Sequence, residues 1–459
     1  MNLQDARRQT ARQQLELPFG SRGEAPKAER SGEASRVASG DARSGTDHLM
    51  ERVVERGNVQ AALKRVQQNQ GSPGGDGMTV ADLPGHLRAH WATIKVQLLA
   101  GTYQPQPVKR QPIPKPGGGV RDLGIPCVLD RVLQQAILQV LQPRFDPTFS
   151  EHSYGFRPGR RAHDAVCAAQ RFLQAGRRWV VDVDLEKFFD RVNHDVLMGR
   201  LAKRIADRRL LGLIRRYLTA GILADGVVIE RVEGTPQGGP LSPLLANVLL
   251  DEVDRELETR GHTFARYADD CNVYVRSKRA GADVLQTLRR LYAKLRLQVN
   301  ETKSAVARPW DRKFLGYSFW VAPGHIVKRR VAPAALATMK AQVRALTRRT
   351  RGCSIPTVVA ELRGYLLGWK AYFRLADTPG VFTTFDQWLR RRLRVVYLKQ
   401  WKRGTTAFRE LRARGVPEIV AAQAASHARR WWVTAHHAAL HIALPTRYFD
   451  QLGVPRLAS

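Results

Sequence analysis

The sequence lacks any apolar stretch close to the ~20 residues that a membrane-spanning helix needs. Its N-terminus also lacks the apolar core of a secretory signal, so we expect a cytoplasmic protein with no membrane partner. Cysteine is scarce: the four cysteines lie far apart and form no Cys-x-x-Cys pair. This spacing disfavours a zinc finger or a zinc-bound nuclease and fits reduced thiols in the cytosol.

Acidic residues are few relative to basic ones. The chain of 459 residues has 75 Lys and Arg against 41 Asp and Glu, a formal net charge of +34. The imbalance is strongest in residues 321–459, with 25 Lys and Arg against six Asp and Glu. So large an excess predicts a polyanionic partner, with nucleic acid favoured over an anionic membrane surface.

Two of the scarce acidic residues, Asp269 and Asp270, are adjacent within residues 264–275. Apolar and aromatic residues flank them on both sides, which predicts strand, tight turn, strand. Adjacent carboxylates repel each other, so we expect a cation there, and Mg²⁺ is suited to carboxylate and phosphate oxygens. The alternative for such a pair is an Asp-rich surface turn.

Further carboxylates lie on a second predicted strand, residues 179–185. Its alternation puts Val181, Val183 and Leu185 on one face, and Asp182 and Asp184 on the other. A sheet could bring Asp184 to the acidic pair. Three such carboxylates holding two Mg²⁺ ions, or Mn²⁺ as a substitute, suit in-line nucleotidyl transfer. Asp182 is the second choice on this face, because it could carry a structural hydrogen bond instead.

The rest of the chain predicts a mixture of helices and strands. Residues 108–126 indicate two strands joined by a glycine-rich hairpin, and residues 195–223 indicate mainly helix. From about residue 323 we expect basic helices.

Several blocks now stand in a definite order along the chain. They are Ser153-Tyr154-Gly155-Phe156-Arg157-Pro158-Gly159-Arg160, Asp184-Leu185-Glu186-Lys187-Phe188-Phe189-Asp190, Gly234-Thr235-Pro236-Gln237-Gly238-Gly239-Pro240, Tyr267-Ala268-Asp269-Asp270 and Phe314-Leu315-Gly316-Tyr317. Over residues 49–401 the chain resembles the reverse transcriptase/maturase proteins encoded by bacterial group II introns. The resemblance implies an α+β right-hand polymerase, with fingers, a palm with an antiparallel sheet, an α-helical thumb and a small basic helical C-terminal segment.

The expected domains follow from the resemblance and from composition. They are a disordered tail (1–48), fingers with an N-terminal extension (49–175), a palm with the catalytic carboxylates (176–322), a thumb or maturase domain (323–402) and a basic DNA-binding segment (403–459). Longer family members continue into a zinc-linked endonuclease. This chain lacks the closely spaced cysteines that such a domain needs, so it resembles the compact branch without an endonuclease.

The resemblance also implies roles for single residues. Asp184, Asp269 and Asp270 match the catalytic, metal-binding carboxylates. The residues that match dNTP contacts are Lys115 and Arg121 for the triphosphate, Gln237 near nucleotide and template, Phe189 as the gate against a ribose 2′-hydroxyl, and Lys303 beside the active site. Phe188 is the alternative gate.

Nucleic-acid contacts are expected in the C-terminal third. Arg363 lies in a segment that resembles the maturase-specific region. In the next helix Phe385, Leu389, Leu393 and Val396 form an apolar stripe. Arg390, Arg391 and Arg394 lie largely off that stripe, which predicts an outward phosphate-binding face.

These observations lead to one expected function and two alternatives. We expect RNA-directed DNA polymerisation together with assistance to intron splicing and retrohoming. The partners would be group II intron RNA, an RNA template with a DNA primer or target DNA, and dNTPs, in a bacterial cytoplasm near the nucleoid. The alternatives are a domesticated reverse transcriptase in repair or defence, and an RNA-binding splicing cofactor without polymerase activity.

Overall fold

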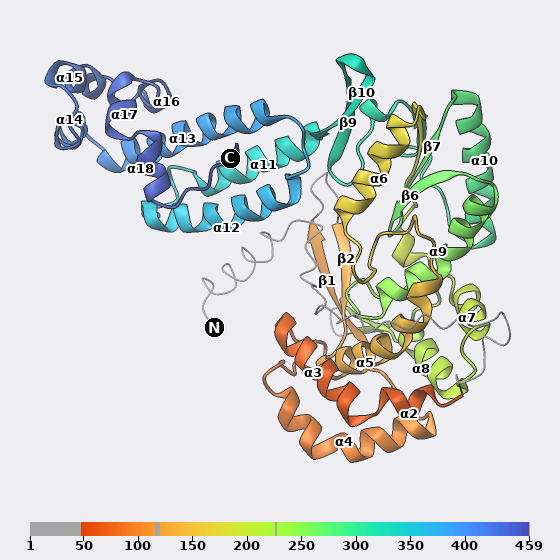
Figure 1. Ribbon diagram of the computed structural model, residues 1–459. Helices are drawn as coiled ribbons and strands as arrows, with labels where there is room; N and C mark the ends of the chain where they lie inside the picture. The colour runs from red at the N-terminus through yellow and green to blue at the C-terminus, as the bar shows by residue number, and fades with distance from the viewer. Residues whose placement is uncertain (1–46, 115–119, 225–226, 459) are drawn as a thin grey trace, which may run out of the picture. The chain divides into compact units, whose positions relative to one another are not determined.

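The computed structural model describes residues 47–114, 120–224 and 227–458, and the predicted N-terminal tail lies almost wholly outside them. The described chain forms two compact units (Figure 1). The larger unit ends at Arg312 and the smaller unit begins at Lys313.

The central sheet of the larger unit has the strand order β6-β7-β3-β8 and is antiparallel throughout. Its strands are β3 (Trp179–Val183), β6 (Thr263–Tyr267), β7 (Asp270–Val275) and β8 (Ala305–Ala307). The predicted alternation in β3 is observed, because Val181 and Val183 are fully buried while Asp182 is half-buried. The strand, turn, strand prediction for the acidic pair is confirmed by β6 and β7.

This sheet contacts the helices α6 (Ala162–Gln174), α9 (Ser242–Thr259) and α10 (Lys278–Lys294). The core is extended by α5 (Val128–Phe145) and α7 (His194–Ala202), which pack on α9, and by α8 (Arg208–Thr219), which packs on α7. Helix α10 contacts β3, β7 and β8, and its approach is close: a Cβ on Gly281 would lie 2.4 Å from Cγ1 of Val306. Figure 1 shows α10, in green, along the flank of the sheet.

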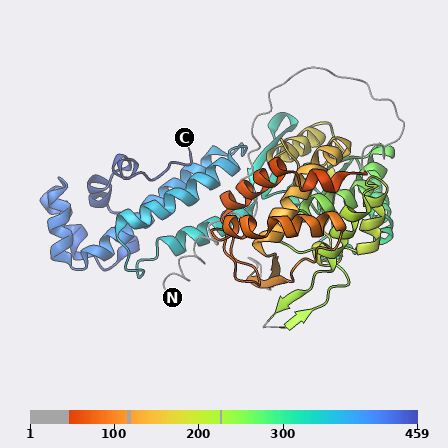
Figure 2. The same ribbon diagram turned by 90° about the horizontal axis from the view of Figure 1, so that it is seen from below.

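A second sheet of the larger unit has the order β2-β1-β4-β5. It contains β1 (Val108–Pro114), β2 (Val120–Ile125), β4 (Ile222–Ala224) and β5 (Val227–Ile229), with helices α2 (Leu49–Val53), α3 (Arg56–Asn69) and α4 (Leu83–Ala100) completing this part of the chain. The β1 and β2 pair confirms the predicted hairpin. The helical prediction for residues 195–223 is wrong at its end, because Ile222 and Leu223 pair with β1. In Figure 2 the β4–β5 ribbon, in light green, projects from its unit.

The smaller unit begins with an antiparallel hairpin, β9 (Tyr317–Ala322) and β10 (Ile326–Val331). The prediction of helices from about residue 323 is therefore wrong for β10, whose Val327 and Val331 alternate as buried residues. Helices follow, namely α11 (Pro333–Leu346), α12 (Ile355–Phe373), α13 (Pro379–Trp401), α14 (Gly404–Ala413), α15 (Glu418–Ser426), α16 (Trp431–Thr434), α17 (Ala438–Ala443) and α18 (Thr446–Gln451). The described residues also contain four short 3₁₀ helices. The larger unit has η1 (Asp146–Thr148), η2 (Phe188–Asp190) and η3 (Pro309–Asp311), and the smaller unit has η4 (Pro323–His325).

Candidate catalytic site

The acidic pair lies at the tip of the β6–β7 hairpin. Tyr267 pairs with Asp270, so the turn consists of Ala268 and Asp269 alone. Ala268 has φ 58°, the left-handed region that a two-residue hairpin turn requires at its first position. Asp269 and Asp270 are both half-buried. The short turn therefore fixes two consecutive carboxylates at the end of adjacent strands.

The register of the sheet brings Asp184 to the same end. In the antiparallel pair of β3 and β7, Val183 is opposite Cys271. One further step along this register puts Asp184 opposite Asp270. The three predicted carboxylates, far apart in the sequence, thus occupy neighbouring backbone positions at one end of β3 and β7.

The backbone of Asp184 is held by the loop before β8. Its carbonyl accepts hydrogen bonds from the backbone N–H of Asn300 (2.8 Å) and the hydroxyl of Ser304 (3.3 Å). Its own N–H donates to Oγ of Ser304 (3.1 Å). The side chain of Lys303, in the same loop, lies with Nζ 3.3 Å from Oδ2 of Asp184. The predicted lysine therefore reaches the predicted first metal ligand and puts a cation there.

Asp182 has a different partner from Asp184. Its carboxylate accepts from Nε of Arg312 at 2.7 Å and forms an ion pair with Nη2 at 2.6 Å. Arg312 also donates to the backbone carbonyl of Lys303. Asp182 thus has a structural ion pair, and through Arg312 it supports the loop that carries Lys303.

The carboxylates form only part of a site for a divalent ion. Within the described ranges, no group of three or more His, Cys, Asp or Glu side chains converges closely enough to form a complete metal cage. Mg²⁺ binds through one or two carboxylates and takes its other ligands from water and substrate phosphates. The neighbouring positions of Asp184 and Asp270, and the Lys303 cation at Asp184, fit such a partial site.

The two adjacent phenylalanines of η2 are not equivalent. Phe188 is 2% exposed and belongs to the hydrophobic core. Phe189 is half-buried, and its ring centroid lies 5.0 Å from that of Phe188 in an edge-to-face contact. Only Phe189 therefore has ring surface available to a nucleotide sugar.

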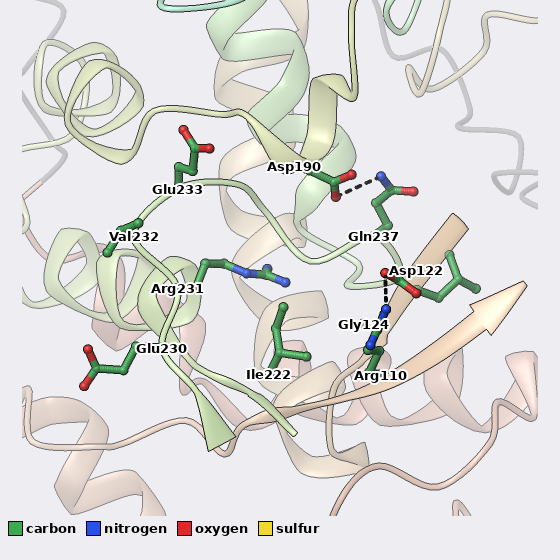
Figure 3. A pocket seen from close by; sticks show the side chains of 11 residues that line it. Arg110, Asp122, Gly124, Asp190, Ile222, Glu230, Arg231, Val232, Glu233 and Gln237 are labelled. Carbon is green, nitrogen blue, oxygen red and sulfur yellow. Dashed lines mark hydrogen bonds and ion pairs between the residues drawn. The ribbon is translucent and has the colours of Figure 1, made fainter. Parts of the chain in front are cut away.

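Gln237 lines a cavity of about 320 Å³ (Figure 3). Its Nε2 donates to Oδ1 of Asp190 at 3.4 Å, and its backbone carbonyl accepts from the N–H of Gly124 on β2 at 3.0 Å. The next residue, Gly238, has φ 135°, and a Cβ there would lie 2.9 Å from the carbonyl oxygen of Gly124. The glycine-rich segment is therefore required for a close approach between β2 and the turn that carries Gln237.

Charged side chains also line the cavity. Figure 3 shows Arg110 and Arg231 among them, and Arg110 forms an ion pair with Asp122 at 2.9 Å. Burial lowers the pKa of Arg231, while Asp190 raises it. Of the predicted triphosphate cations, Arg121 pairs with Ile113 through the backbone of β2, and its side chain is not described. Lys115 lies outside the described residues.

The prediction that the α13 arginines face outward is wrong for Arg394, whereas Arg390 and Arg391 are both half-buried. Arg394 is 4% exposed and donates from Nε (3.2 Å) and Nη2 (2.9 Å) to the carbonyl of Leu444, just after α17. Arg391 donates to the carbonyl of Trp432 (3.1 and 2.7 Å) and lies over the Trp432 ring. Helices α14 and α16 also pack on α13, so residues off its main apolar stripe are covered.

Arg390 and Arg363 remain on the surface of the smaller unit. Arg390 is half-buried, and Arg363 is exposed with Nη1 3.4 Å from the carbonyl of Gly453.

No helix in the described part of the chain is both long and apolar enough to cross a membrane.

Sequence reasoning missed several residues that shape this site. Gly155 lies in one of the blocks named above, but neither that block nor any pattern around Ser304, Arg312, Asn247 and Asp254 indicated the contacts that these residues make. Arg266 is adjacent to the acidic tetrad on a strand that reads as buried, and an arginine on a buried strand is a signal that could have been used.

Two protein families match separate segments of the chain. Residues 113–319 match the family described as reverse transcriptase (RNA-dependent DNA polymerase), and residues 336–415 match the maturase-specific domain of group II introns. Protein YkfC of Escherichia coli (strain K12) is 39% identical over 193 residues, covering 41% of this chain and 51% of YkfC. The group II intron-encoded protein LtrA of Lactococcus lactis subsp. cremoris is 41% identical over 156 residues, covering 34% of this chain and 26% of LtrA.

The matches thus span about half or less of the length of these curated relatives. Among solved structures, the partial Cas6-RT-Cas1–Cas2 complex is similar with 28% identity and a TM-score of 0.36, over 55% of this chain and 43% of that chain. The predicted α+β fold class of a right-hand polymerase is confirmed by the reverse transcriptase match and the antiparallel sheet.

Proposed function

We propose RNA-directed DNA synthesis for this chain, which belongs to the bacterial group II intron-encoded reverse transcriptase/maturase family. The reaction joins the 3′-oxygen of a primer to the α-phosphorus of a dNTP and releases pyrophosphate. The same chain would bind its intron RNA, assist splicing and take part in retrohoming in a bacterial cytoplasm.

The observation that carries the proposal is the register of β3 and β7. It leaves Asp184 opposite Asp270, one residue from Asp269 in the turn. Members of the reverse transcriptase family use divalent ions such as Mg²⁺. Asp184, Asp269 and Asp270 would hold two of them here. When bound, such ions lower the pKa of the attacking hydroxyl and neutralise charge on the departing pyrophosphate.

The protein's own residues would bind and orient the substrates. Phe189 would exclude a ribose 2′-hydroxyl, because its half-buried ring is held against the buried Phe188. Gln237 would contact the nucleotide or template from the cavity wall. Lys303 would stay near Asp184 and exchange its carboxylate partner for substrate phosphate.

Triphosphate capture is assigned to Lys115 and Arg121. Two cations on one hairpin suit a triphosphate, since charge-assisted hydrogen bonds are about twice as strong as neutral ones. Intron RNA would bind to the smaller unit, where Arg363 and Arg390 remain the contacts we propose. The excess of 25 Lys and Arg over six Asp and Glu in residues 321–459 supports that choice.

The test is primer extension on an RNA template by the purified full chain. Asp269→Asn should lower the rate by on the order of 10³-fold or more, because a metal ligand acts directly on transition-state charge. Intron-RNA affinity, measured on the same preparations, should stay within about twofold, since metal ligands are not phosphate-contacting cations.

Asp283→Asn is the matched control, since Asp283 is exposed on α10 and has no proposed role. Near-normal extension by Asp269→Asn would refute the site. A wild-type chain that binds intron RNA but extends no primer would favour the splicing cofactor without polymerase activity.

A further inference from the structure

The acidic hairpin is attached to a completely buried arginine. Arg266 on β6 and Asp254 on α9 are both 0% exposed. The guanidinium donates from Nε to Asp254 (2.7 and 3.0 Å), from Nη1 to Asn247 Oδ1 (3.0 Å) and the Ala268 carbonyl (2.9 Å), and from Nη2 to Ser153 Oγ (2.8 Å) and Asp254 Oδ2 (2.5 Å). Five N–H groups thus face three side chains and one turn carbonyl, which satisfies all of its donors.

The carbonyl that Arg266 binds belongs to the turn itself. Ala268 precedes Asp269 and has the left-handed φ of 58°. A non-glycine residue in that region persists where the surroundings hold it. The hydrogen bond from Nη1 of Arg266 is a direct restraint on the peptide that leads into Asp269.

A second restraint reaches the same turn from residues 152–155. Arg266 exchanges backbone hydrogen bonds with His152 (2.9 Å) and Tyr154 (2.8 Å), so this segment runs along the edge of β6. Gly155 then meets the turn, and a Cβ on it would lie 2.3 Å from the backbone nitrogen of Ala268.

Asn247 on α9 joins the two restraints. Its Nδ2 donates to the Gly155 carbonyl at 2.9 Å, while its Oδ1 accepts from Arg266. The turn is therefore enclosed between the Arg266 side chain and the Gly155 backbone, and Asn247 bridges both.

Such a buried ion pair is a poor way to obtain stability alone, because desolvation offsets much of the attraction. Burial opposes the charge of Arg266, but the Asp254 carboxylate raises the pKa of Arg266 above its ordinary value, so the guanidinium stays charged. An apolar pair of similar volume could fill this space but could not donate to the Ala268 carbonyl. The buried ion pair is therefore explained by its hold on the Ala268 carbonyl in the turn.

We propose that Arg266, held by Asp254 and Asn247, is a positioning residue for the metal-binding hairpin. It fixes the Ala268–Asp269 turn so that Asp269 and Asp270 present their carboxylates in one orientation to divalent ions. The inference deepens the proposed polymerase function and rests on it.

The experiment compares Arg266→Lys with wild type in the full chain. Lysine keeps the charge opposite Asp254 but cannot also reach the Ala268 carbonyl and Asn247. The maximal rate of primer extension should fall on the order of 10²-fold, as for a displaced catalytic group. The Mg²⁺ concentration for half-maximal rate should rise several-fold, while affinity for primer–template should not change.

Direct Mn²⁺ binding, followed by electron paramagnetic resonance, separates this inference from the proposed function. If wild type binds Mn²⁺ and Arg266→Lys binds it more weakly, the positioning role is supported even where neither protein extends a primer. Unchanged Mn²⁺ binding, with an unchanged Mg²⁺ dependence wherever extension is seen, would overturn it.

Two further variants guard against a general loss of folding. Asn247→Ala keeps the ion pair and removes only the bridge, so it should show the same changes at smaller size. Tyr217→Phe removes one hydrogen bond from the buried Asp130 in the same unit and should leave Mg²⁺ dependence at the wild-type value. If Arg266→Lys and Asn247→Ala both match Tyr217→Phe in their Mg²⁺ dependence and their Mn²⁺ binding, Arg266 has only a structural role.

Discussion

The two units differ in the partners of their buried and half-buried arginines. In the larger unit Arg157, Arg266 and Arg312 each pair with an aspartate, although the buried Arg131 donates to the Pro126 carbonyl. In the smaller unit, Arg391 and Arg394 donate to backbone carbonyls and lie against aromatic rings. The difference follows from composition, because residues 321–459 have only six Asp and Glu to serve 25 Lys and Arg.

This difference changes how net charge is interpreted. A carboxylate partner neutralises an arginine, but a carbonyl or an aromatic ring satisfies its geometry and leaves its charge. The smaller unit can therefore use arginines structurally and still attract phosphate at long range. A basic helix in such a unit is not by itself a row of phosphate contacts.

The loss of an arginine that pairs with a carboxylate should lower the free energy of unfolding more than the loss of one that donates to a carbonyl. Arg157 is 7% exposed, binds Asp146 at 2.8 Å and also donates to the Ser150 carbonyl. Arg157→Met should lower the free energy of unfolding by about 3 kcal/mol, because the half-buried Asp146 carboxylate and the Ser150 and Ser153 carbonyls all lose their donor. Urea unfolding of the full chain measures it.

The double variant Arg157→Met with Asp146→Asn separates charge from packing. It should recover part of the loss, since the stranded charge is gone. A double variant no more stable than Arg157→Met alone would show that the carboxylate is not what distinguishes this arginine.

In the smaller unit, Arg394 and Arg390 form a matched pair on one helix. Arg394→Gln should cost about 2 kcal/mol, because the Leu444 carbonyl loses its donors in a buried place. Arg390→Gln should cost less than about 0.5 kcal/mol, as is usual for surface substitutions. It should instead reduce the log–log salt slope of intron-RNA binding by about one unit.

Urea unfolding measures the stability of both variants, and RNA binding at several salt concentrations measures their salt slopes. Equal stability losses would mean that Arg390 is also structural. An unchanged salt slope in a folded Arg390→Gln protein would remove it from the proposed RNA contacts.

Much of the geometry of the candidate catalytic site could be predicted from the local sequence pattern. Alternation around Asp184 and the apolar flanks of Asp269 gave strands, and adjacent strands in one sheet bring such residues together. The partners of Arg266 could not be predicted in this way, because Ser153 lies 113 residues away and meets it only through the fold. The prediction for Arg394 is wrong for a related reason: periodicity finds one apolar stripe but cannot reveal that the Leu444 carbonyl and the Phe449 ring also lie against the helix.

The last prediction concerns a buried carboxylate of the larger unit that accepts hydrogen bonds from two tyrosines and a backbone N–H. Asp130 is 1% exposed and accepts from the hydroxyls of Tyr103 (2.9 Å) and Tyr217 (3.2 Å) and from the N–H of Gln106 (3.1 Å). Burial raises the pKa of Asp130 to about 6, against the opposing effect of these hydrogen bonds. The folded protein therefore takes up a proton near pH 6 that the unfolded chain takes up only near its ordinary value.

Stability contributed by this group is consequently greater at low pH and is lost as the pH rises through about 6. Between pH 8 and pH 5, wild type should gain about 1.5 kcal/mol relative to Asp130→Asn, which cannot titrate. Urea unfolding of both proteins at several pH values measures the difference, in which the other titrating groups cancel. Parallel curves for the two proteins would show that Asp130 stays charged in the folded protein over this pH range.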